Sequence, residues 1–187
     1  MKLYVLKFLG SIRTPWVFLI VFTLLLSQGI CAANNNTSTM AITCNILPAI
    51  GISFPTELEL GSIAPDFKRS GSYVLSDLQY MKVWSNTEWA LKIQSDSPDG
   101  RMQEWTGTEY ADRILSSPLE WQLDSESIFN RITGNEELVI EGGQPTDEDG
   151  TAIGIRFRQY ISYGDSPILS PGNNYKIEVT LTAIQTY

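Results

Sequence analysis

The residue inventory of this 187-residue chain rules out most enzyme chemistry before any fold is considered. There is no histidine, so neither a Ser-His-Asp nor a Cys-His catalytic group can form, and no metal site can use imidazole ligands. None of the glycine-rich nucleotide-binding motifs occurs. The chemistry that remains is glycoside hydrolysis by two carboxylates. With 21 acidic residues some pair always looks suitable, so the sequence predicts a protein that is not an enzyme and retains this hydrolase as a minor alternative.

Carboxylates also suggest one metal site. In the stretch Asp147-Glu148-Asp149-Gly150, Asp147 and Asp149 lie on one side of a tight turn, as at the start of calcium-binding loops. The full twelve-residue EF-hand pattern does not follow, and a solvated turn explains the same residues. The sequence therefore predicts no cofactor, with calcium at Asp147 and Asp149 as the alternative.

Aromatic side chains are the candidate ligand-binding groups. Trp105 and Tyr110 flank a polar stretch, where exposed rings can stack on sugars or on a partner protein, and where rings can instead cap the edge of a core. Three other tryptophans lie within strand-like patterns and are expected in the core: Trp84, Trp89 and Trp121.

The N-terminal segment predicts export. Three basic residues precede an apolar run over 17–26 and the small residues Ala32 and Ala33, which is typical of a signal peptide over residues 1–33. An uncleaved membrane anchor over 16–33 is the alternative. A polar tail follows over residues 34–39, in which Asn35 and Asn36 each begin a glycosylation sequon.

The chain beyond the leader is strongly acidic. The leader takes three of the 13 basic residues and none of the 21 acidic ones, which leaves a formal charge of 10 − 21 = −11. Nucleic acids and anionic membranes attract clustered Lys and Arg, so neither is expected as a partner.

The body of the chain predicts strands. Alternating apolar and polar residues, separated by turn-forming Gly, Pro, Asn and Asp, recur over residues 40–187, and no convincing amphipathic helix does. We expect one all-β domain over 40–187, an Ig-like antiparallel β-sandwich of about nine strands. The expected strands include 39–47, 50–54, 80–84, 88–94, 119–123, 137–141, 153–161 and 175–183, and a helical turn is expected at 109–115.

The first of these strands has a special position. Over 39–47 it contains no charge, and alternation places four side chains on one face: Met40, Ile42, Cys44 and Ile46. The strand either pairs inside its own domain or completes the sheet of another copy by strand exchange. Cys44 is the only cysteine beyond the leader; we expect a buried thiol, with an intermolecular disulfide as the alternative.

Several short motifs resemble secreted envelope proteins. The stretch Leu60-Gly61-Ser62-Ile63-Ala64-Pro65, the later Ser85-Asn86-Thr87-Glu88-Trp89-Ala90-Leu91 and the C-terminal strand are similar to WxL-type cell-surface domains and to pilin-like filament subunits. The C-terminal strand departs from the WxL pattern, because Leu181-Thr182-Ala183-Ile184 lacks tryptophan. The resemblance implies an extracellular sandwich with an interaction role.

Two functions follow as expectations. The first is a secreted or cell-surface structural or adhesive subunit whose partners are copies of itself or other envelope components, assembled by β-strand addition. The second is a module that binds polysaccharide or cell wall through Trp105 and Tyr110.

Overall fold

The computed structural model describes residues 38–66 and 72–186. The chain divides into two units, Met1–Cys44 and Asn45–Tyr187. In the first unit, residues 38–44 contain no strand and their side chains are exposed. The predicted signal peptide over 1–33 and the sequons at Asn35 and Asn36 lie outside the described residues.

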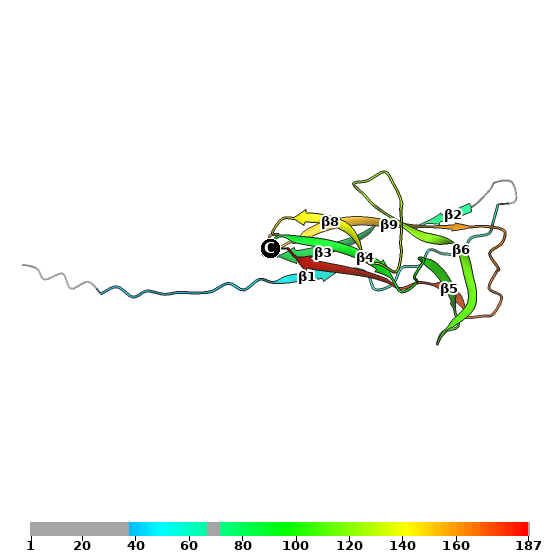
Figure 1. The fold of residues 1–187 in the computed structure, drawn as a ribbon, viewed down its shortest axis with the longest axis horizontal. Helices are drawn as coiled ribbons and strands as arrows, with labels where there is room; N and C mark the ends of the chain where they lie inside the picture. The colour runs from blue at the N-terminus through cyan, green and yellow to red at the C-terminus, as the bar shows by residue number, and fades with distance from the viewer. Residues whose placement is uncertain (1–37, 67–71, 187) are drawn as a thin grey trace, which may run out of the picture. The chain divides into compact units, whose positions relative to one another are not determined.

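The second unit is built from strands, and its described residues contain no helix (Figure 1). The described residues form the strands β1 (Ile50–Ser53), β2 (Ser72–Leu75), β3 (Gln79–Ser85), β4 (Trp89–Ser95), β5 (Arg101–Trp105), β6 (Tyr110–Leu123), β7 (Asn130–Arg131), β8 (Glu137–Gly143), β9 (Thr151–Ile161), β10 (Asn174–Lys176) and β11 (Val179–Gln185).

These strands form two antiparallel sheets. The larger has the order β1-β3-β9-β6-β5-β10, with β2 also paired to β9 and β7 to β6; the smaller has the order β11-β4-β8. Both sheets contribute to one hydrophobic core, so the predicted all-β class with two packed sheets is confirmed. The core side chains come from β3, β4, β6 and β9 and the segment after β7: Met81, Val83, Trp89, Leu91, Ile93, Leu119, Trp121, Leu123, Ile132, Ile153, Ile155 and Phe157.

Period-2 alternation explains why these strands bury one face. In β9 the buried residues occupy every second position, while Arg156 and Arg158 point to the other face. Trp89 and Trp121 lie in the core as expected. Trp84 does not: it is half-buried on the opposite face of β3, where its indole N–H donates to the Glu148 carbonyl oxygen at 3.2 Å.

Three predictions about elements are wrong. Residues 39–47 form no strand. Residues 110–115 belong to β6, not to a helical turn; β6 pairs with β5 through register shifts that break simple alternation. The single strand expected over 175–183 is two strands in different sheets, since β10 pairs with β5 and β11 pairs with β4.

No helix in the described part of the chain is long and apolar enough to span a membrane.

Candidate functional site

The segment that precedes β1 exposes its apolar side chains. Met40 is 80% exposed, Ile42 82%, Ile46 85% and Leu47 78%. Cys44 is exposed as well, so the predicted burial of its thiol is wrong. The strand expected over 39–47, which could have buried these side chains within one chain, is not formed, because residues 38–49 contain no strand. Contiguous exposed apolar side chains of this kind usually mark an interaction site.

Asn86 fixes the point where this segment joins the sheet. Its side-chain amide donates to the Leu47 carbonyl oxygen at 2.9 Å, and its side-chain oxygen accepts from the Ala49 N–H at 2.8 Å. The Asn86 backbone N–H donates to the Ala49 carbonyl at 3.3 Å. Regular pairing with β3 begins one residue later, where Ile50 faces Ser85.

The smaller sheet ends in an incompletely covered strand. β11 pairs with β4 along all seven of its residues and is the terminal strand of its sheet. Its inward side chains Val179, Leu181 and Ala183 pack against the core but are only partly buried. The matching residues of β4, Leu91 and Ile93, are 0% and 1% exposed. The core is therefore less well covered along β11 than along its neighbour.

β1 and β11 lie side by side, each at the end of its own sheet (Figure 1; β1 cyan, β11 red). Terminal strands present backbone N–H and C=O groups that an added strand can pair with. The edge of β11 that β4 does not use thus faces β1, and among the described strands β1 and β11 are not paired with each other.

The two aromatic residues singled out from the sequence lie together. Trp105 ends β5, Tyr110 begins β6, and the two residues face each other in the strand pair. Their ring centroids are 5.1 Å apart in an edge-to-face arrangement. The Lys176 ammonium lies 4.4 Å from the Trp105 ring centroid.

Tyr110 also lines a groove of about 350 Å³ beside this aromatic pair. The groove is formed by the loop between β4 and β5 and by one face of β5, β6 and β10. Its polar lining residues are Asp96, Ser97, Asp99, Arg101, Gln103, Tyr110 and Lys176. Trp105 lies outside the lining and packs against two residues that belong to it, Tyr110 and Lys176.

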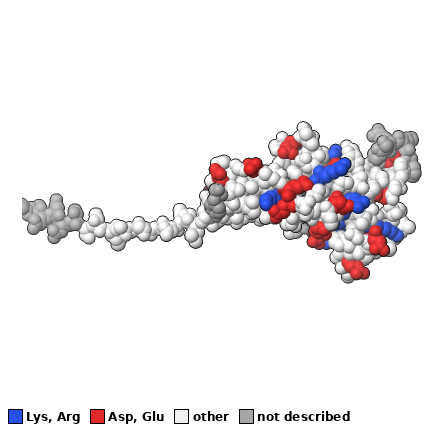
Figure 2. Space-filling model, viewed as in Figure 1, with Lys and Arg blue, Asp and Glu red and all other residues white. Residues whose placement is uncertain are grey.

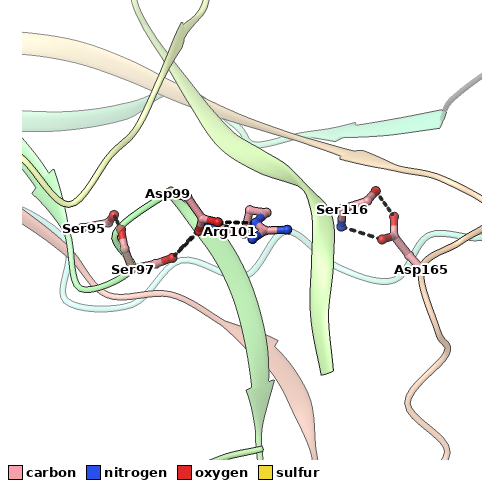
Figure 3. Close-up of polar contacts among 6 residues, drawn as sticks. All are labelled: Ser95, Ser97, Asp99, Arg101, Ser116 and Asp165. Atoms are coloured by element: carbon pink, nitrogen blue, oxygen red, sulfur yellow. Dashed lines mark hydrogen bonds and ion pairs between the residues drawn. The ribbon is translucent and has the colours of Figure 1, made fainter. Parts of the chain in front are cut away.

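Hydrogen bonds fix the polar groups of the groove. The Tyr110 hydroxyl donates to Asp96 Oδ2 at 2.6 Å, and burial together with this carboxylate raises the pKa of Tyr110 above its usual range. The Arg101 guanidinium pairs with the Asp99 carboxylate and lowers the pKa of Asp99. Figure 3 shows this pair together with Ser97, whose hydroxyl donates to Asp99 Oδ1 at 3.1 Å.

A second carboxylate, Asp165, has a structural role beside this region (Figure 3). It accepts from the Ser116 N–H and from the Ser162 N–H, each at 2.7 Å. Both its oxygens are thus used to tie the loop after β9 to β6.

The candidate calcium ligands lie in a turn. Asp147 Oδ1 accepts from the Asp149 N–H at 3.1 Å, and the Gly150 N–H donates to the Asp147 carbonyl at 3.2 Å. Among residues 38–66 and 72–186, no group of three or more His, Cys, Asp and Glu side chains is placed to hold a metal ion. The contacts of Asp147 match an Asx-type turn.

No known family model matches this chain, and neither a curated protein nor a solved structure resembles it significantly.

The sequence analysis predicted Trp105 and Tyr110 as binding residues but, apart from Tyr110, none of the residues that line the groove. Arg101, Gln103 and Trp105 recur at every second residue, which is the pattern of one strand face. A polar stretch with this spacing between Gly100 and Gly107 was a signal for β5. Asp96 and Lys176 come from distant segments, and only the fold brings them to the same groove.

Proposed function

We propose that this protein is an exported structural subunit that assembles with other copies of itself by β-strand addition. The observation that carries the proposal is the exposed alternating segment over 39–47, which forms no strand, in a chain whose smaller sheet ends at β11 among the described strands.

The inserted strand would be residues 39–47. Met40, Ile42, Cys44 and Ile46 share one face of an extended chain and supply the side chains for a partner's core. No Lys, Arg, Asp or Glu occurs in this segment to oppose burial, and it is uncharged in the space-filling view (Figure 2). Fully burying one such side chain contributes about 1.5–3 kcal/mol.

The acceptor would be the edge of β11 that faces β1, where an added strand would enter between β1 and β11 or displace β1. The spacing fits: Met40 to Ile46 in an extended chain spans roughly 20 Å, as do the seven residues of β11. An added strand would continue the row formed by Val179, Leu181 and Ala183, whose partial burial leaves apolar surface for it to cover. Backbone pairing would supply affinity and the alternating side chains would supply register.

The leader and the composition of the chain support the same role. The signal-peptide pattern over 1–33 supports export, and the acidic composition of the remainder supports a soluble subunit surface. The absence of histidine supports a role that is not catalytic.

A peptide-binding experiment tests the strand pairing. The acceptor is the full chain with Ile42→Asp and Ile46→Asp, which disables its own segment, and the ligand is a labelled peptide of residues 38–48 with Cys44→Ser. We expect saturable binding by fluorescence anisotropy. A matched peptide with Ile42→Asp and Ile46→Asp should bind more than about a hundredfold more weakly, because it loses two buried apolar side chains.

Hydrogen exchange identifies the acceptor strand. Bound peptide should slow amide exchange in Val179–Gln185, the edge proposed to accept it. Protection of Glu137–Gly143, the other end of the smaller sheet, would show that β11 is not the acceptor. Equal binding of both peptides would contradict strand addition.

A further inference from the structure

We propose that the groove between the β4–β5 loop and the face formed by β5, β6 and β10 is a binding site for an uncharged saccharide. The site is separate from the edge of β11 proposed for strand addition and adds recognition of a ligand to the proposed structural role. All the residues that line the groove belong to one subunit, so the site does not require assembly.

The face that forms the groove is built by alternation along three strands. In β5, Arg101 and Gln103 point into the groove with Trp105 at the end of the same row. Lys176 of β10 lies opposite Gln103, and Tyr110 of β6 lies opposite Trp105. Three strands therefore place polar side chains with different chemistry on one surface.

The residues that line the groove carry no net formal charge among themselves. Asp96 and Asp99 contribute two negative charges, and Arg101 and Lys176 contribute two positive ones. On a chain with a formal charge of −8, this balance is a local departure from the average surface. A neutral ligand fits such a surface, because both cations that an anionic ligand would need are already paired, Arg101 with Asp99 and Lys176 with Glu178 Oε1 at 2.7 Å.

The polar groups offer both donors and acceptors. Arg101 and Lys176 carry only donors, and the Asp99 carboxylate carries only acceptors. Gln103 donates one N–H to the Ala111 carbonyl oxygen and keeps its amide oxygen and a second N–H. The Tyr110 oxygen donates to Asp96 and so retains acceptor capacity. A sugar hydroxyl is a donor and an acceptor at once, so this mixture matches a hydroxyl-rich ligand.

Apolar surface lies beside these groups. Ile114 is 45% exposed and Tyr110 37% exposed, and Pro98 completes the lining. A pyranose ring has C–H groups on its faces, and an aromatic or aliphatic wall covers these while the polar groups bind its rim. Trp105 holds the Tyr110 ring edge-to-face and so supports this wall.

The loop that closes the groove is held in place before any ligand binds. Ser95 Oγ donates to the Ser97 carbonyl at 2.7 Å, and the Ser97 hydroxyl in turn binds Asp99 (Figure 3). Asp96 accepts from the Glu178 N–H at 2.9 Å, which ties the loop to the segment before β11. A preformed site loses less conformational entropy on binding.

The test is a binding measurement on immobilised oligosaccharides. The probe is a panel of neutral hexose and N-acetylhexosamine oligomers with sulfated and uronic-acid oligomers beside them. The protein is the full chain carrying Ile42→Asp and Ile46→Asp, so that assembly cannot contribute avidity. We expect binding to at least one neutral oligomer and weaker binding to the acidic ones.

Variants locate the site. Arg101→Ala and Tyr110→Ala should each weaken binding at least about tenfold, while Tyr110→Phe, which keeps the ring, should have a smaller effect. Arg113→Ala and Tyr73→Ala, at exposed positions outside the groove lining, are the matched controls and should leave binding unchanged. Thermal melts of all variants identify any loss of folding.

Three results would overturn the proposal: no binding to any neutral oligomer, binding restricted to the acidic ones, or equal losses in the groove variants and their controls. None of these bears on strand addition, which is tested by the peptide experiment with β11. Failure of saccharide binding and failure of strand addition can therefore be told apart.

Discussion

At the scale of single residues, the fit of Gly143 against Trp89 shows how closely the smaller sheet is packed. A Cβ atom at position 143 would overlap the Trp89 indole ring, whose N–H donates to the Gln144 carbonyl at 2.8 Å. Gly143 and Trp89 are paired across β8 and β4. The absence of a side chain thus lets a large core residue reach the sheet edge.

Replacing Gly143 with alanine should therefore destabilise the fold by about 1–3 kcal/mol, because the added methyl group overpacks the core. Gly51→Ala is the matched control, since nothing lies within 4 Å of a Cβ placed there, and it should change the free energy of unfolding by less than about 0.5 kcal/mol. Urea denaturation followed by tryptophan fluorescence measures both. Equal effects of the two substitutions would contradict this packing.

The contact of Tyr110 with Asp96 makes a pH prediction. Burial, and then the Asp96 carboxylate, raise the pKa of Tyr110 above its ordinary value of 10.0. The protonated phenol is the form that the fold favours, so this contribution to stability is complete below pH 10 and is lost as the pH rises through the raised pKa.

The measurement is an absorbance titration of phenolate in the native protein and in Tyr110→Phe. Their difference should show a single group that ionises later than an ordinary tyrosine. A difference curve with its midpoint at the ordinary tyrosine pKa would show that the Asp96 contact does not form.

At the scale of elements, the sequence predicted the central strands well. β3 and β9 have clear alternation, as β4 has from Leu91 onward, and each has one face in the core, so burial and pattern agree. The class of fold follows from these strands. Their turns, such as the one at Asp147, also follow from local chemistry.

The elements that sequence failed to predict depend on distant contacts. β2 and β7 are short strands that exist because β9 and β6 lie beside them. The break between β10 and β11 separates two sheets at a point where alternation continues, so the pattern contains no sign of it. Beside the candidate groove, Lys176 approaches Trp105 because β10 pairs with β5 and not with the sheet that contains β11.

The segment over 39–47 illustrates the opposite error. Its alternation is that of a half-buried strand, yet Ile42 and Ile46 are over four-fifths exposed. Alternation indicates that a segment suits a half-buried strand. It does not indicate whether the partner strands belong to the same chain or to another copy. Strand addition predicts this combination: the segment alternates in sequence, and in a single subunit it forms no strand because its partner strands belong to another copy.

This segment gives a stability prediction. Ile42→Asp with Ile46→Asp should change the free energy of unfolding of the subunit by less than about 0.5 kcal/mol, because both side chains are exposed. Leu91→Ala, in the fully buried part of β4, should cost about 2–5 kcal/mol. Chemical denaturation of dilute protein compares them. A loss of several kcal/mol in the double variant would place the segment inside its own sandwich.

At the scale of the whole molecule, acidic and basic side chains are interspersed over the strand-rich unit (Figure 2). No strong field of one sign gathers on the visible face, and the segment before β1 has no charge. Apolar association through this segment should therefore depend little on salt, since surface charges contribute little to it.

Export makes a prediction that mass spectrometry checks. Expressed from the full reading frame in a host with a secretory pathway, the chain should lose residues 1–33 and begin at Asn34. An intact mass that retains residues 1–33 in the membrane fraction would favour the anchor instead.

The most direct test of strand addition is the size of the native protein in solution, measured by light scattering after size-exclusion chromatography over a range of concentrations. The full chain should form concentration-dependent polymers, Ile42→Asp with Ile46→Asp should remain monomeric, and Ala41→Asp with Thr43→Asp should still polymerise. The last variant adds the same charge to the opposite face of the strand. A native chain that stays monomeric at every concentration, or two variants that lose assembly equally, would contradict insertion of this segment into a neighbouring subunit.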